Sequence, residues 1–76
     1  MNNKRRIQLR KVIAILDSAS NCIDDVLSDE QDSLDNMPEN LEGSDQYLKM
    51  EEAIDKLEDA VELIDGVKEC LEDAMG

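Results

Sequence analysis

Carboxylates are the most abundant reactive groups in this chain, and one set of them follows a regular spacing. Seven acidic residues recur every three or four positions between residues 51 and 72, which places them along one side of a helix. We call this set the acidic rail: Glu51, Asp55, Glu58, Glu62, Asp65, Glu69 and Glu72. Its carboxylates step by about 5 Å, within a factor of two of the phosphate spacing on a nucleic-acid strand, roughly 3.4 Å. The rail is therefore either a solvated helix face or a mimic of nucleic acid that occupies a basic cleft.

The chain offers little material for catalysis or for metal binding. It has no histidine, tryptophan or phenylalanine, no nucleophile elbow and no glycine-rich phosphate-binding loop. Carboxylates on exposed helix faces are poorly suited to proton transfer near neutral pH. The acidic stretch 24–35 lacks the spacing and the central glycine of an EF-hand calcium loop. We therefore expect a protein that is not an enzyme and that has no catalytic residue, cofactor or metal.

The two cysteines, Cys22 and Cys70, are not expected to form a disulfide. In a hairpin that folds near residue 39, Cys22 would face the mid-fifties and Cys70 would face the start of the chain. Their separation would far exceed the limit of about 7 Å between Cα atoms that a disulfide allows. Both are expected to be small core or near-core residues, and reduced thiols suit the cytoplasm.

Charge is distributed unevenly along the sequence. Residues 1–11 carry five basic side chains and no acid, whereas residues 12–76 carry all twenty acids and only three lysines. The net charge of −12 disfavours nucleic-acid binding by the whole chain and suits a basic protein partner. The basic end (Lys4, Arg5, Arg6 and Arg10) leaves a weaker alternative, contact with nucleic acid or an anionic membrane surface.

No segment is expected to enter a membrane. The apolar run near the basic start covers only residues 12–16, because Arg10 and Lys11 interrupt it. A signal-peptide core needs about 7–15 apolar residues, and a membrane span needs about 20. The expected location is therefore the cytoplasm.

Apolar periodicity predicts one domain, residues 1–76, with two long helices. The first helix, about residues 3–30, carries a stripe of Leu9, Val12, Leu16, Ala19, Ile23 and Val26, widened by Ile13 and Leu27. A connection of about residues 31–44 is broken at Pro38, with Gly43 as a left-handed cap and Ser44 or Asp45 capping the next helix.

The second helix, about residues 45–74, is apolar over three positions in every seven. A main stripe of Met50, Leu57, Ile64 and Leu71 is joined by Ile54, Val61 and Met75, and a second row holds Ala53, Ala60, Val67 and Ala74. Such a wide face suits a bundle helix that touches more than one neighbour. We therefore predict an all-α antiparallel hairpin that dimerises into a four-helix bundle. The expected dimer core is Leu9, Val12, Leu16, Ile23, Met50, Ile54, Leu57, Val61, Ile64 and Leu71.

Three stretches carry a resemblance to a known group of proteins. They are the opening NKRR followed by Leu9, the centre DEQDSLDNMPENLEGS (29–44) and the segment MEEAIDKLEDAVELID (50–65). Together they resemble short, acidic, helical proteins of uncharacterised activity encoded by phages and prophages of Gram-positive bacteria. The resemblance implies a phage-borne accessory protein and brings no catalytic residues with it.

These observations predict a small, non-enzymatic accessory or interaction protein that acts as a helical homodimer. The alternative is an acidic mimic of nucleic acid that inhibits a DNA-binding enzyme of the host or the phage. In the first case the partner is a second copy of the chain, and in the second it is a basic protein.

Overall fold

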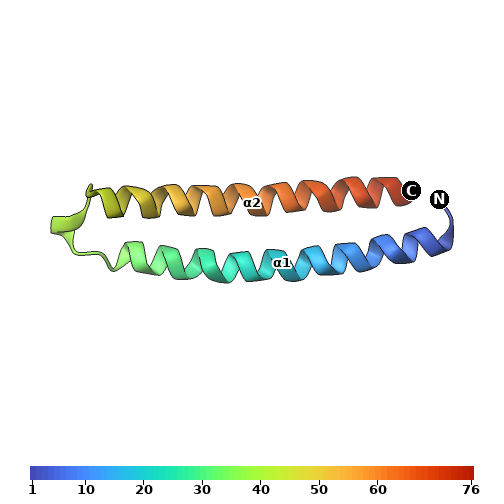
Figure 1. The fold of residues 1–76 in the computed structure, drawn as a ribbon, viewed down its shortest axis with the longest axis horizontal. Coiled ribbons are helices and arrows are strands. Elements are labelled where there is room, and N and C mark those ends of the chain that lie inside the picture. The colour runs from blue at the N-terminus through green and yellow to red at the C-terminus, as the bar shows by residue number, and fades with distance from the viewer.

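Two long helices account for nearly the whole chain. The computed structural model describes all 76 residues and contains α1 (Asn3–Asp35), a short 3-10 turn (Glu39–Leu41) and α2 (Asp45–Met75). The helices run antiparallel as a rod of 59 × 15 × 12 Å, with both chain ends at one end of the rod (Figure 1). The prediction of an all-α helical hairpin is confirmed.

The first turn of α1 is basic, and two hydrogen bonds compensate for this unfavourable charge. The side chain of Asn2 caps the helix by accepting a hydrogen bond from the Arg5 backbone N–H, at 2.9 Å. The Nε of Arg6 donates to the carbonyl oxygen of Met75 at 3.0 Å, where the end of α2 leaves carbonyls without helical partners. Arg6 therefore binds the backbone at the end of α2, and no basic side chain of residues 4–11 makes an ion pair.

Helix α1 continues to Asp35, five residues past the predicted end near residue 30. The Nε2 of Gln31 donates to the Asp35 carboxylate at 3.0 Å, and Leu34 is half-buried against α2. This local bond and this packing outweigh the weak helix propensity of the polar segment. Pro38 then prevents α1 from continuing, because a proline disfavours helical backbone in the residue before it.

The connection follows the turn chemistry expected from its sequence. Gly43 adopts a φ of +80°, a conformation that side-chain-bearing residues rarely take. Ser44 caps α2, because its Oγ accepts a hydrogen bond from the Tyr47 backbone N–H at 3.3 Å. Leu34 and Met37 are half-buried at this end of the hairpin, whereas Leu41 is exposed.

The two helices meet along one apolar seam. Only Ile54 and Ser20 are fully buried, and the other seam residues are half-buried. On α1 the seam holds Leu9, Ile13, Leu16, Ser20, Ile23, Leu27 and Leu34; on α2 it holds Met50, Ile54, Leu57, Val61, Ile64, Lys68, Leu71 and Met75.

The α1 side of the seam differs from the predicted stripe. Val12, Ala19 and Val26 are exposed, and the residue following each of them, Ile13, Ser20 or Leu27, occupies the seam. Apolar residues fill both neighbouring columns of α1, so periodicity alone fits either one. Because Ser20 is polar, the apolar pattern did not identify the column of Ile13, Ser20 and Leu27 as the one in the seam.

Neither helix contains a stretch that is long and apolar enough to cross a membrane.

Candidate interaction face

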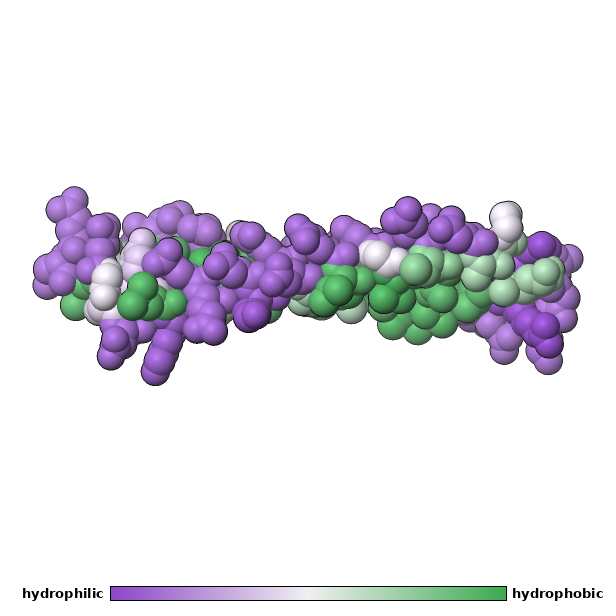
Figure 2. All heavy atoms as spheres, turned by 90° about the horizontal axis from the view of Figure 1, so that it is seen from above, coloured by the Kyte–Doolittle hydropathy of each residue, from purple (hydrophilic) through white to green (hydrophobic).

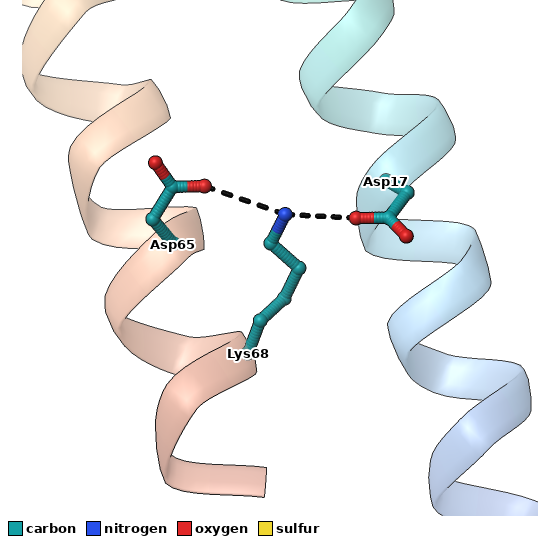
Figure 3. Close-up of polar contacts among 3 residues, drawn as sticks. All are labelled: Asp17, Asp65 and Lys68. Carbon is teal, nitrogen blue, oxygen red and sulfur yellow. Dashed lines mark hydrogen bonds and ion pairs between the residues drawn. The ribbon is translucent and has the colours of Figure 1, made fainter. Parts of the chain in front are cut away.

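The hairpin has one tertiary ion-pair cluster, centred on Lys68. Its Nζ lies 2.8 Å from Asp17 Oδ1 across the seam and 3.3 Å from Asp65 Oδ1 on its own helix (Figure 3). The hydrogen bond to Asp17 raises the pKa of Lys68 above its ordinary value, desolvation opposes this, and Asp65 adds to the rise. Lys68 therefore bridges the two helices at the edge of the seam.

The Lys68 cluster also shows which helix columns share a side of the hairpin. Asp17 follows the seam residue Ile13 by four positions, and Asp65 follows the seam residue Val61 by four. Because both carboxylates reach the same Nζ, these equivalent columns lie on the same side of the seam. An antiparallel helix pair has an approximate two-fold axis perpendicular to the plane that contains both helices. This axis relates each column of α1 to the equivalent column of α2, so the two columns of every such pair lie on the same side of the seam.

The columns on the other side of the seam are apolar on both helices. On each helix they alternate by three and four residues, starting one position before a seam residue. We call the surface that they form the lateral face: Val12, Ile15, Ala19, Cys22 and Val26 of α1, with Ala60, Leu63, Val67, Cys70 and Ala74 of α2.

The lateral face is largely open to solvent. Leu63 is 71% exposed and Ile15 is 66% exposed, and Val12, Val26 and Val67 are each more than two-fifths exposed. Figure 2 shows apolar surface gathered over the half of the rod that carries the chain ends, whereas the other half is mainly hydrophilic in this view. Residues 12–26, the α1 part of the lateral face, span about 21 Å of helix.

The acidic rail lies on the opposite side of α2. Asp65 belongs to it and marks its side of the seam, and Glu51, Glu58 and Glu72 share the column of Asp65. All seven rail residues are exposed. The hairpin therefore presents two surfaces of opposite character, an apolar one and an acidic one.

The ten residues expected in the dimer core divide between two places. Nine of them lie in the seam within one chain, with Ile54 fully buried and the rest half-buried. Val12 alone lies on the lateral face, where it is 41% exposed. The most exposed apolar residues, Ile15 and Leu63, were not among the ten, although their three-and-four spacing from neighbouring apolar residues could have identified them.

The cysteines and the surface hollows add no chemical site. Cys22 and Cys70 are free and exposed on the lateral face. The prediction that they are core or near-core residues is therefore wrong. One open surface hollow is lined by Asp59, Glu62 and Leu63. No three side chains of the metal-binding types gather where they could hold an ion.

Comparison with protein-family models, curated proteins and solved structures gives no match to this chain. Functional inference therefore depends on the two surfaces of the hairpin.

Proposed function

We propose that this chain is a non-enzymatic interaction protein that acts as a homodimer, with two hairpins joined through their lateral faces into a four-helix bundle. The observation that carries the proposal is the lateral face itself, apolar on both helices and open to solvent. Large contiguous apolar patches on soluble monomers mark interaction sites.

The small core supports self-association. The hairpin fully buries only two residues, and a chain of this size gains little stability from a single core. Packing two lateral faces together would bury both of them and would make each seam residue part of a four-helix core. The residues of the predicted dimer core and of the lateral face would then form one continuous interior.

The resemblance to small acidic phage and prophage proteins supports an accessory role of this kind. We place it in the cytoplasm, where free Cys22 and Cys70 would remain reduced. An interaction role also agrees with the two exposed surfaces, which suit protein contacts better than proton or group transfer.

Sedimentation equilibrium at micromolar concentration tests the proposal. The chain has a mass of 8.6 kDa, and we expect twice that mass in solution. Leu63→Lys should give the monomer mass, because it places an ammonium group at the centre of the buried interface. This change lowers the net negative charge, so dissociation would not result from stronger repulsion.

Leu48→Lys is the matched control. Leu48 is 53% exposed, lies on the same helix and is outside the lateral face. We expect this variant to retain the dimer mass. A wild-type chain that stays monomeric at micromolar concentration would refute the homodimer.

A second candidate function uses the acidic rail, whose seven carboxylates are all exposed on the side away from the lateral face. A dimer would carry two such rails on its outer surfaces, available to a basic cleft of a DNA-binding enzyme. This function requires salt-sensitive binding to a basic protein. Reversing the charges of Glu58, Glu62 and Asp65 should weaken that binding, and unchanged binding would exclude the rail as the contact.

A further inference from the structure

We propose that the two hairpins pack head to tail, with the connection of each beside the chain ends of the other. This inference rests on the proposed homodimer and adds its orientation. Two lateral faces can overlap in two ways, with the connections at the same end or at opposite ends. The charge pattern along the rod distinguishes these two arrangements.

Charge is polarised along the long axis of the hairpin. The half with the chain ends, residues 1–18 and 65–76, carries six basic and five acidic side chains. The half with the connection, residues 19–64, carries two basic and fifteen acidic side chains. One half is thus nearly neutral, and the other holds almost all of the net negative charge.

The lateral face spans the boundary between these halves: its α1 row is centred on Ala19, and its α2 row, residues 60–74, extends farther toward the chain ends (Figure 2). In a same-end dimer, the two strongly acidic halves would lie side by side. In a head-to-tail dimer, each acidic half would lie beside the nearly neutral half of the partner, which includes the basic residues 4–11. Since unlike charges favour an interface and like charges oppose it, the head-to-tail arrangement has the lower electrostatic energy.

Individual columns of α1 agree with this orientation. Head-to-tail packing places α1 against the partner's α1 and α2 against the partner's α2. The outer edge of the α1 lateral face is a column with a seven-residue period: Lys4, Lys11, Ser18, Asp25 and Asp32. Reversing this column about Ser18 sets Lys11 beside the partner's Asp25 and Lys4 beside the partner's Asp32.

The apolar rows of α1 are self-complementary under the same operation. Val12 meets the partner's Val26, Ile15 meets the partner's Cys22, and Ala19 meets its own copy near the two-fold axis. Small side chains at the axis allow the two α1 helices to approach closely. On α2, Leu63 meets its own copy and Val67 meets the partner's Ala60, but Cys70 meets the partner's Lys56. The operation also produces one like-charge approach, between Glu52 and the partner's Asp73.

Same-end packing places α1 against the partner's α2, where the apolar rows also meet one another but the charged columns match less well. The α1 outer column then meets the column Asp73, Gly66, Asp59 and Glu52 of the partner, in that order from Lys11 onward. Lys11 gains Asp73 and Asp29 gains Lys56 as an oppositely charged neighbour, but Asp25 faces Asp59 and Asp32 faces Glu52, so favourable and like-charge approaches are equal in number. Favourable approaches exceed like-charge ones only in the head-to-tail dimer.

Distances between spin labels test the orientation directly. The background variant is Cys22→Ala with Cys70→Ala, which keeps small apolar side chains on the lateral face. One label is attached at Asn40→Cys in the connection, and a second preparation carries it at Asn3→Cys near the start of α1. Each of α1's two ends lies about 24 Å along the helix from Ala19.

In the head-to-tail dimer, two labels at residue 40 should be about 50 Å or more apart. In a mixed dimer, a label at residue 40 and a label at the partner's residue 3 should lie within about 25 Å, since packed helices are roughly 8–10 Å apart. The reverse pattern, short for the 40–40 pair and long for the mixed pair, would overturn the orientation and leave the homodimer intact. A monomer mass for the unlabelled wild-type chain would instead overturn the homodimer itself.

Discussion

Ile54 has the most buried side chain in the hairpin, with 5% of its surface exposed. Truncation by Ile54→Ala should lower the free energy of unfolding by about 2–4 kcal/mol, because the seam loses apolar contacts and gains a cavity. Leu48→Ala, at a position 53% exposed, should change it by less than about 0.5 kcal/mol. Urea unfolding followed by circular dichroism compares the two variants. Equal losses would show that Ile54 does not contribute more to the core than an exposed leucine.

Lys68 makes the stability of the hairpin sensitive to alkaline pH. The Asp17 hydrogen bond raises the pKa of Lys68 in the folded state above 10.5. The stabilisation that Lys68 contributes is complete at pH values below its pKa in the unfolded chain. This stabilisation is lost as the pH rises through the pKa of Lys68 in the folded chain. Between pH about 9 and about 12, the thermal midpoint of the wild type should therefore fall further than that of Lys68→Met. Parallel curves for the two proteins would contradict a stabilising role for the Lys68 cluster.

At the scale of the helices, two glycines should respond oppositely to substitution. Gly66 lies inside α2, and an added Cβ meets no atom within 4 Å, so Gly66→Ala should stabilise the protein by about 1 kcal/mol. Gly43→Ala should destabilise it by about 1 kcal/mol or more, because its φ of +80° is strained for alanine. Thermal unfolding of both variants measures the difference. A destabilising Gly66→Ala would indicate that another chain approaches this position closely.

The sequence predicted the helices and their caps better than it predicted the α1 surfaces. Pro38, Gly43 and Ser44 each have one strong local preference, so the connection followed from residue type. The end of α1 depended on packing of Leu34 against α2, which no local pattern contains. The seam column of α1 was ambiguous, because Val12 and Ile13 are both apolar and Ser20 is polar. The lateral face was recognised only on α2, where the alanine row stands beside an unambiguous stripe.

The net charge of −12 acts on the whole molecule. Raising the salt concentration from about 0.01 M to about 0.15 M shortens the screening length from roughly 30 Å to roughly 8 Å, below the width of the rod. Repulsion among carboxylates should weaken, and the thermal midpoint should rise by a few degrees. A variant with Glu58→Gln and Glu62→Gln should show a smaller rise. A midpoint that falls with salt would mean that attractive ion pairs dominate.

The placement of both chain ends at one end of the rod has a mechanical consequence (Figure 1). Force applied at residues 3 and 75 acts perpendicular to the helix axes. The helices therefore separate progressively from the chain ends and do not shear past each other. The bond from Arg6 to the Met75 carbonyl breaks first, and the Lys68–Asp17 pair carries the load soon after. We therefore expect the hairpin to open one pair of contacting turns after another, at low force. The same rod gripped at the connection and at one end of the chain would be stretched along its helices instead.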